Sequence, residues 1–212
     1  IQNMNLPSKI PVFPLSNFII FPKTSVPLNI FEARYIQMVD DAINGDGIIG
    51  MIQPKKKNSD IPTLYDIGCA GKISNINKTK DGRYLIVING ISRFKIEKEI
   101  DTKKKYREFS INFKEYSSDL IDEKKSINFS DLELIFKNFK YLFDKMGYLI
   151  NWKELEKESL DKTINGLSMA APFSSEEKQI LLESVSISER KKKLEEILKT
   201  YVLDDFSNTT IQ

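Results

Sequence analysis

The chain has 212 residues, of which 41% are hydrophobic and 29% are charged, a composition typical of one or two globular domains. It contains no histidine and one cysteine, Cys69, which excludes hydrolases that use a Ser-His-Asp or Cys-His arrangement, Cys₂His₂ zinc sites and thiolate metal clusters. Because one cysteine cannot form an intrachain disulfide, we expect a reducing, cytoplasmic location.

Charge is distributed unevenly around a net value of +2. Residues 1–116 carry 18 basic and 12 acidic residues, a net charge of +6, whereas residues 117–212 carry 14 and 18, a net charge of −4. This asymmetry predicts two different surfaces, neither basic enough to require nucleic acid. No window approaches the ~18 apolar residues of a membrane span, and we find no secretory signal, so no membrane association is expected.

Four prolines divide the apolar opening of the chain into short runs: Pro11, Pro14, Pro22 and Pro27. Because proline has no backbone N–H, these runs are predicted to form edge, bent or terminal strands. The first half of the chain as a whole predicts seven strands, near residues 10–14, 25–30, 47–53, 67–76, 83–89, 91–99 and 106–115.

One amphipathic helix, near 32–44, is predicted to interrupt these strands, with Tyr35, Met38, Val39 and Ala42 on its inner stripe. Turns are predicted at Asp81-Gly82 and at Asn89-Gly90. The run between them is apolar on both faces, because Tyr84, Ile86 and Ile88 alternate with Leu85 and Val87. We therefore expect this strand to be buried on both sides, as in a closed barrel.

The periodicity changes from about Ser130 onward, and apolar residues recur at helical spacing. Ser130 and Glu133 form a capping-box signature at the start of the first helix. A second helix is predicted over 151–170 with a break near Gly166, a third begins around Ser174, and the last covers 188–203.

Two glycine-containing segments resemble phosphate-binding loops only superficially. Residues 45–50 match GxGxxG, but they follow a helix and open a strand, the reverse of a dinucleotide site, so a helix stop and turn is favoured. Residues 68–72 lack the first glycine and the final Ser or Thr of a P-loop. Their small side chains are predicted to allow a close approach of a neighbouring element, and Cys69 is predicted to be a small core residue. We predict no cofactor, no metal and no catalytic residue.

The apolar run from Phe18 to Phe21 has two interpretations. Burial in the core is favoured over exposure, but an exposed patch would bind extended apolar peptide segments. Under that hypothesis the peptide-binding residues are Phe18, Ile19 and Phe21. Three lysine triplets, beginning at Lys55, Lys103 and Lys191, are interpreted as solvated surface rather than as a phosphate-binding patch.

Several motifs together resemble the amino-terminal, substrate-binding domain of Lon proteases. The opening carries Phe13-Pro14-Leu15, Phe21-Pro22, Pro27-Leu28 and Ile30-Phe31-Glu32-x-Arg34-Tyr35. Later segments that share the resemblance are Leu64–Ile73, Asp81–Tyr84, Gly90–Phe94 and Ala170–Phe173. We assign no binding role to Glu32, Arg34, Tyr35, Arg93 or Phe94, which look structural.

The resemblance implies an α+β fold, a PUA-like and mainly antiparallel β pseudobarrel with one inserted helix, followed by a helical bundle. The corresponding domains are 1–116 for the β domain, 117–128 for a linker, 129–204 for the helical subdomain and 205–212 for a disordered tail. No residue matches the ATPase or Ser-Lys peptidase motifs of full Lon proteases. The resemblance therefore implies a non-catalytic protein that binds unfolded or extended polypeptide segments, as an adaptor or holdase alongside a protease or chaperone. RNA binding is the alternative, since PUA-like barrels often bind RNA and the β half is net positive.

Overall fold

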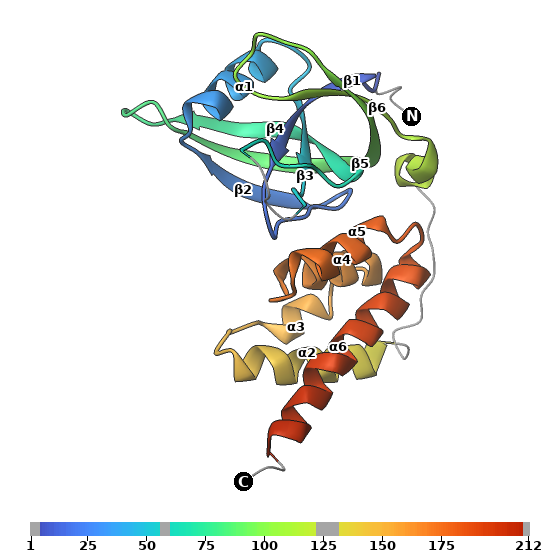
Figure 1. The fold of residues 1–212 in the computed structure, drawn as a ribbon. Helices are drawn as coiled ribbons and strands as arrows, with labels where there is room; N and C mark the ends of the chain where they lie inside the picture. Colours follow the sequence, from blue (N-terminus) through green and yellow to red (C-terminus); the bar gives the residue numbers. More distant parts are fainter. Residues whose placement is uncertain (1–4, 56–59, 122–131, 210–212) are drawn as a thin grey trace. The chain divides into compact units, whose positions relative to one another are not determined.

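The computed structural model describes residues 5–55, 60–121 and 132–209. The chain divides into two compact units, residues 1–122 and 123–212, which we call the barrel unit and the helical unit and describe separately (Figure 1). No helix in the described ranges combines the length and the hydropathy needed to cross a bilayer.

The barrel unit is a mixed six-stranded sheet with one helix, α1 (Ala33–Ile43), between its second and third strands. The sheet order is β2-β5-β4-β3-β1-β6, and a further pairing of β5 with β6 closes it. Among the strand pairs of the described residues, β1–β3 alone is parallel. The predicted α+β fold with a mainly antiparallel barrel is confirmed. Its strands are β1 (Lys9–Pro14), β2 (Ser25–Ile30), β3 (Ile48–Ile52), β4 (Ile67–Lys78), β5 (Tyr84–Ile100) and β6 (Glu108–Asn112).

The prolines lie where the sheet needs fewer backbone donors. Strand β1 pairs with β6 over residues 9–11 and with β3 over residues 12–14. Each half of β1 therefore pairs with one neighbouring strand. Pro27 lies in β2, which pairs only with β5 among the described strands. The prediction of bent and edge strands from the proline spacing is therefore confirmed.

Strand β5 runs unbroken through Gly90, so the turn predicted at Asn89-Gly90 is wrong. A Cβ at position 90 would lie 2.0 Å from the carbonyl oxygen of Phe21, which shows that this glycine admits another backbone segment rather than a turn. The hairpin predicted at Asp81-Gly82 is confirmed, with Gly82 at a φ of +86° between β4 and β5.

The two-sided burial predicted for this strand is also wrong. Tyr84, Ile86 and Ile88 are buried, as the alternation requires, but Leu85 is 44% exposed and Val87 is half-buried. One face of the β2–β5–β4 sheet is therefore open, because alternation alone gives no information on what covers the second face.

Small residues allow the barrel to close tightly around Phe94, which is fully buried. A Cβ at Gly68 would lie 2.5 Å from the Met51 carbonyl oxygen and 2.7 Å from the Phe94 ring. Cys69 is 1% exposed. The close approach predicted for residues 68–71, and the core position of Cys69, are confirmed.

A buried ion pair holds the end of the barrel unit in place. Residues Lys114–Leu120 form a 3₁₀ segment, η1, where the sequence predicts the end of a strand and the start of the 117–128 linker. Arg93 of β5 donates from Nε and Nη2 to the two carboxylate oxygens of Asp119, both at 2.9 Å. The Arg93 backbone N–H also donates to Asp119, at 3.0 Å, and the guanidinium stacks on Tyr116. This pairing draws residues 117–120 into the barrel unit.

The helical unit consists of α2 (Glu133–Lys145), α3 (Trp152–Leu155), α4 (Leu160–Ala170), α5 (Ser175–Glu183) and α6 (Ile187–Thr209). The break in the second predicted helix lies between α3 and α4, not at Gly166, which is inside α4. The capping box of Ser174 and Glu177 at the start of α5 is present, whereas Ser130 lies outside the described residues. The backbone of α6 is helical to residue 209, so a disordered tail from residue 205 is wrong for 205–209.

One hydrogen bond across the helical unit predicts a pH dependence. The Tyr201 hydroxyl of α6 donates to Glu177 Oε1 of α5 at 2.6 Å, and burial together with this carboxylate raises the pKa of Tyr201 to about 12. Since the unfolded tyrosine titrates near 10, the folded state retains its proton longer. The contribution of Tyr201 to the free energy of unfolding is therefore complete below pH 10 and is lost as pH rises toward 12.

We expect denaturation midpoints, followed through the single tryptophan Trp152, to fall less steeply over this pH range in Tyr201→Phe than in the unmodified chain. Ionisation of the other tyrosines and of the lysines is common to both proteins, so the difference in slope isolates Tyr201. Equal slopes would contradict the assignment.

Candidate functional site

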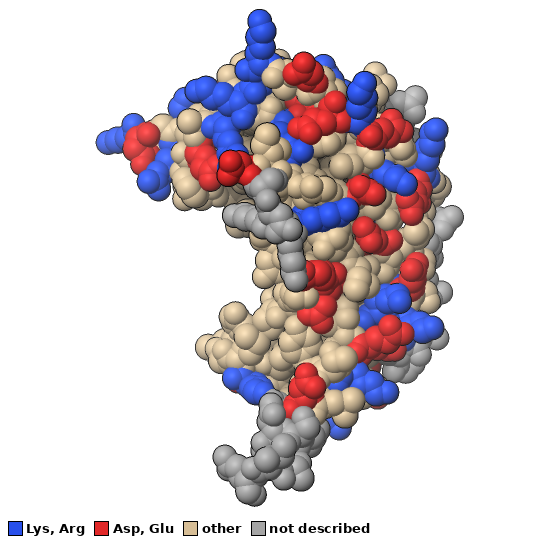
Figure 2. Space-filling model, viewed as in Figure 1, with Lys and Arg blue, Asp and Glu red and all other residues tan. Residues whose placement is uncertain are grey.

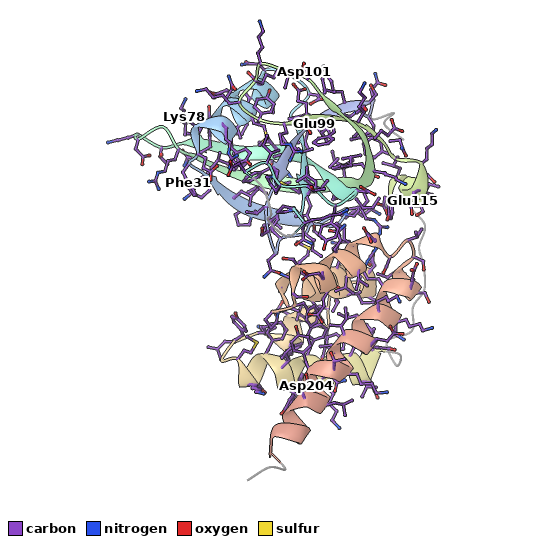
Figure 3. All side chains as sticks on the ribbon, in the orientation of Figure 1. Phe31, Lys78, Glu99, Asp101, Glu115 and Asp204 are labelled. Carbon is purple, nitrogen blue, oxygen red and sulfur yellow. The ribbon has the colours of Figure 1, made fainter. Side chains whose placement is uncertain are left out.

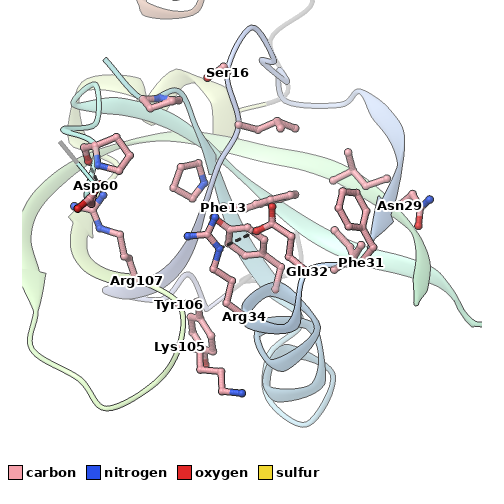
Figure 4. Close-up of a pocket in the computed structure, with 17 residues that line it drawn as sticks. Phe13, Ser16, Asn29, Phe31, Glu32, Arg34, Asp60, Lys105, Tyr106 and Arg107 are labelled. Atoms are coloured by element: carbon pink, nitrogen blue, oxygen red, sulfur yellow. Dashed lines mark hydrogen bonds and ion pairs between the residues drawn. The ribbon is translucent and has the colours of Figure 1, made fainter. Parts of the chain in front are cut away.

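The barrel unit contains a cavity of about 640 Å³, within the size range of ligand-binding pockets (Figure 4). Its walls come from segments far apart in the sequence: the end of β1, the β2–α1 junction, the chain after β3 and the chain just before β6. In Figure 4, Asp60 and Arg107 lie on one side, and Phe31 and Asn29 on the other.

Aromatic side chains line much of this cavity. The rings of Phe13 and Tyr35 are 4.3 Å apart between centroids, and both residues are more than nine-tenths buried. Burial raises the pKa of the Tyr35 hydroxyl. Phe31 differs, because it is 60% exposed on the rim of the barrel unit at the end of β2 (Figure 3). The cavity thus combines a fixed aromatic wall with one largely exposed aromatic side chain, whose ring centroid lies 5.9 Å from the Arg83 guanidinium carbon.

Basic groups slightly outnumber acidic groups around the cavity: Arg34, Lys105 and Arg107 against Glu32 and Asp60. Arg34 Nε donates to Glu32 Oε2 at 2.8 Å, and this bond raises the pKa of the Arg34 guanidinium. The Lys105 ammonium has no partner among the described residues. Figure 2 shows other lysine and arginine side chains, interspersed with acidic ones, over α1 and the β4–β5 hairpin.

Arg107 is fixed by two other residues at the edge of the cavity. It donates to both carboxylate oxygens of Glu99, at 2.6 and 2.9 Å, and to the Pro62 carbonyl oxygen at 2.8 Å. The guanidinium lowers the pKa of Glu99. Because its charge is already paired, Arg107 contributes shape more than free charge, and Lys105 is better placed to attract an anion.

Hydrogen bonds from the barrel hold α1 against the cavity. The Tyr84 hydroxyl donates to Asp40 Oδ1 at 2.5 Å, and the Tyr106 hydroxyl donates to Asp41 Oδ2 at 2.6 Å. The pKa of each tyrosine is raised, for Tyr84 mainly by its bond to Asp40 and for Tyr106 mainly by burial. These bonds orient the helix so that Tyr35 in its first turn faces the cavity, and the predicted stripe of Tyr35, Met38, Val39 and Ala42 is buried as expected.

The three residues predicted to bind peptide do not line this cavity. Ile19 is 3% exposed and Phe21 is 0% exposed, while Phe18 is half-buried. The exposure that the hypothesis required is therefore wrong for Ile19 and Phe21. Phe21 lies against β5, where its carbonyl oxygen approaches Gly90, so the core interpretation holds for residues 19–21 of this run and not for the half-buried Phe18.

The sequence analysis did not identify Phe31, Lys105 or the β2–α1 junction as parts of a site. The one signal in the sequence that could have indicated the junction was Phe31, an aromatic residue immediately before the charged first turn of a helix. Position and local polarity did not show that Lys105–Arg107 folds opposite that junction.

The described residues contain no group of three or more His, Cys, Asp or Glu side chains arranged to hold a metal ion. The cavity instead offers aromatic faces, paired guanidinium groups and one ammonium. These groups suit the non-covalent binding of apolar and mixed-polarity side chains.

Comparisons with known proteins agree with this architecture. The sequence model for the ATP-dependent protease La (LON) substrate-binding domain matches residues 9–200. The chain belongs to this family. It is similar to the "Lon protease" of Flavobacterium johnsoniae, with 30% identity over 199 residues that cover 89% of this chain and 24% of that protein. The "Lon protease" of Dictyoglomus thermophilum is 26% identical over 91% of this chain and 24% of its own length.

Two solved structures show the same fold. The Lon N-terminal domain protein from Xanthomonas campestris aligns with a TM-score of 0.63 at 17% identity, covering 91% of this chain and 98% of that one. The N-terminal domain of the Mycobacterium avium complex Lon protease aligns with a TM-score of 0.62 at 15% identity, covering 90% and 98%. The chain thus spans about a quarter of the length of the two curated relatives and nearly all of both solved domains.

Proposed function

We propose that the barrel unit binds unfolded or extended polypeptide segments and that the cavity beside Phe31 receives their apolar side chains. Membership of the substrate-binding family supports a recognition role. The observation that carries the proposal is the pairing of an exposed phenylalanine with a buried aromatic wall, since Phe31 is 60% exposed beside Phe13 and Tyr35. An aromatic side chain left in water at a cavity rim gains most when a ligand covers it.

In this proposal the protein acts as a recognition module without catalysis, an adaptor or holdase that hands segments to a protease or chaperone in the cytoplasm. The aromatic wall supplies affinity, and the charged rim adjusts which segments bind. RNA binding is the competing function, favoured by the net charge of +6 on residues 1–116. The two functions differ in salt dependence, because neutralising phosphates releases counterions whereas burying apolar surface does not.

Removal of the Phe31 ring tests this function directly. In a fluorescence anisotropy titration with a labelled, reduced and carboxymethylated α-lactalbumin, we expect Phe31→Ala to weaken binding about tenfold, which corresponds to ~1.4 kcal/mol. Leu149→Ala is the matched control, because Leu149 is fully exposed in the helical unit and does not line the cavity.

The control variant should bind as the unmodified chain does, and added salt should change the affinity little. Equal binding by all three proteins would reject the cavity as the site. Binding of a single-stranded RNA that falls steeply with salt, without binding of the unfolded protein, would support the RNA alternative instead.

A further inference from the structure

We propose that the polypeptide binds as an added β-strand along the free edge of β2, with its side chains directed alternately into the cavity and onto the open face of the sheet. This inference rests on the proposed function and specifies how the segment is held. It commits to one occupant, an extended segment with apolar residues at alternate positions and an acidic residue on the side that faces the cavity.

The edge of β2 is unpaired in the described part of the chain. Strand β2 is the last in the sheet order and pairs with β5 alone. The Gly90 N–H donates to the Thr24 carbonyl oxygen at 2.8 Å, so the Thr24 carbonyl points toward β5. The backbone N–H and C=O groups of successive residues in a strand point to opposite sides. The backbone groups of Val26, Leu28 and Ile30 therefore point to β5, and those of Ser25, Pro27 and Asn29 point outward.

Pro27 fits this alternation, because the one residue of β2 without an N–H lies where no bond to β5 is required. It leaves an edge with two outward donors, at Ser25 and Asn29, and three outward carbonyls. A proline in the middle of an edge strand limits uncontrolled pairing, since a partner strand loses one hydrogen bond there. The edge is therefore able to accept a short segment while discouraging extended aggregation.

Hollows lie on both sides of this edge. On the inner side is the cavity, lined by Ile30 and Phe31, and two residues of β2, Leu28 and Asn29, line both hollows. On the outer side is a shallow depression of about 470 Å³ over the open sheet face, lined by Pro27, Asn29, Asn77, Leu85 and Val87 among others.

Because successive side chains of a strand point to opposite faces, a strand added beside β2 would direct alternate residues into the two hollows. The exposed Leu85, which the sequence predicts to be buried, forms part of the outer contact surface.

Charge distinguishes the two hollows and so defines the occupant. The residues lining the outer depression carry no charge, which suits apolar or amide side chains. The cavity has three basic residues against two acidic ones, and the Lys105 ammonium has no partner among the described residues. An acidic side chain on the cavity-facing side of the segment would complement this excess of basic residues.

Two substitutions at one outward position test strand addition. Asn29→Pro removes the outward N–H without removing a bond to β5, whereas Asn29→Ala retains it. In titrations with a labelled strand-length peptide of alternating valine and threonine with one central glutamate, we expect Asn29→Pro to bind at least tenfold more weakly than Asn29→Ala, because both variants lose the amide side chain and only the proline lacks the outward N–H. Pro27→Val, which adds a donor, should bind several-fold more tightly. Thermal unfolding of each variant checks that the barrel unit is intact.

The peptide itself provides a test that leaves the protein unchanged. N-methylation of the backbone nitrogens of one alternating set should abolish binding, and methylation of the other set should have little effect, because only one set faces β2. Equal effects of the two sets, together with equal binding by both Asn29 variants, would overturn strand addition. If Phe31→Ala still weakened binding in that case, the proposed function would stand without strand addition.

Failure of the unmodified chain to bind any peptide would reject the proposed function itself. Concentration-dependent dimerisation that Asn29→Pro abolishes, without peptide binding, would overturn the inference in favour of a second copy at this edge.

Discussion

Arg93→Ala should destabilise the barrel unit by about 3–5 kcal/mol, because it leaves the Asp119 carboxylate buried without its counterion. The side chains of Arg93 and Asp119 are only 2% and 9% exposed, and they meet through two parallel hydrogen bonds. The guanidinium also packs against Tyr116, at 4.2 Å from the ring centroid. Its loss therefore removes packing together with charge.

The measurement is urea unfolding combined with hydrogen exchange of peptides from β5 and η1, where amide exchange should become much faster. Arg83→Ala is the matched control, since Arg83 pairs with Asp81 at 3.1 Å but both side chains are more than half exposed. An exposed pair contributes only ~0–1 kcal/mol, so this control should remain close to the unmodified protein.

The double variant Arg93→Ala/Asp119→Ala separates the two contributions. If the unpaired Asp119 carboxylate causes most of the loss of stability in Arg93→Ala, the double variant should be more stable than the sum of the two single changes predicts. Strict additivity, or equal stability of Arg93→Ala and Arg83→Ala, would show that the buried pair does not stabilise the barrel.

Much of the barrel could be predicted because local chemistry and tertiary structure agree there. The stripe on α1 follows the helical period, and the prolines identify β2 as an edge strand. The Asp81-Gly82 hairpin has a local cause, since Gly82 adopts a positive φ that glycine tolerates. Each of these features depends on residues close together in the sequence.

The errors occur where distant segments decide the outcome. Asn89-Gly90 has the sequence of a turn, but the backbone of Phe21, distant in the chain, explains the glycine. The run at Phe18–Phe21 does not show by its composition whether another strand covers it. The cavity is composed of four separate segments, and only the fold brings Lys105 opposite Phe31. The candidate site was therefore much less predictable than the fold.

Gly90→Ala should destabilise the barrel unit by about 3 kcal/mol, at the upper end of the cost of overpacking. The new Cβ would lie 2.0 Å from the Phe21 carbonyl oxygen and 2.8 Å from its carbon, and both are backbone atoms. The nearby turn is also held by hydrogen bonds, from the Lys23 N–H to the Gly90 carbonyl at 3.0 Å and from the Gly90 N–H to the Thr24 carbonyl. The clash can therefore be relieved only by moving residues 21–24 away from β5.

Gly166→Ala provides the contrasting substitution, because a Cβ there meets no atom within 4 Å inside α4. It should stabilise the helical unit by about 0.5–1 kcal/mol through the higher helix propensity of alanine. Differential scanning calorimetry of both variants measures the two effects. If strand addition is also correct, displacement of residues 21–24 should misalign the start of β2 and weaken peptide binding by Gly90→Ala well below its melting temperature. Retention of full stability and full binding would mean that the close approach at Gly90 constrains neither the fold nor the edge.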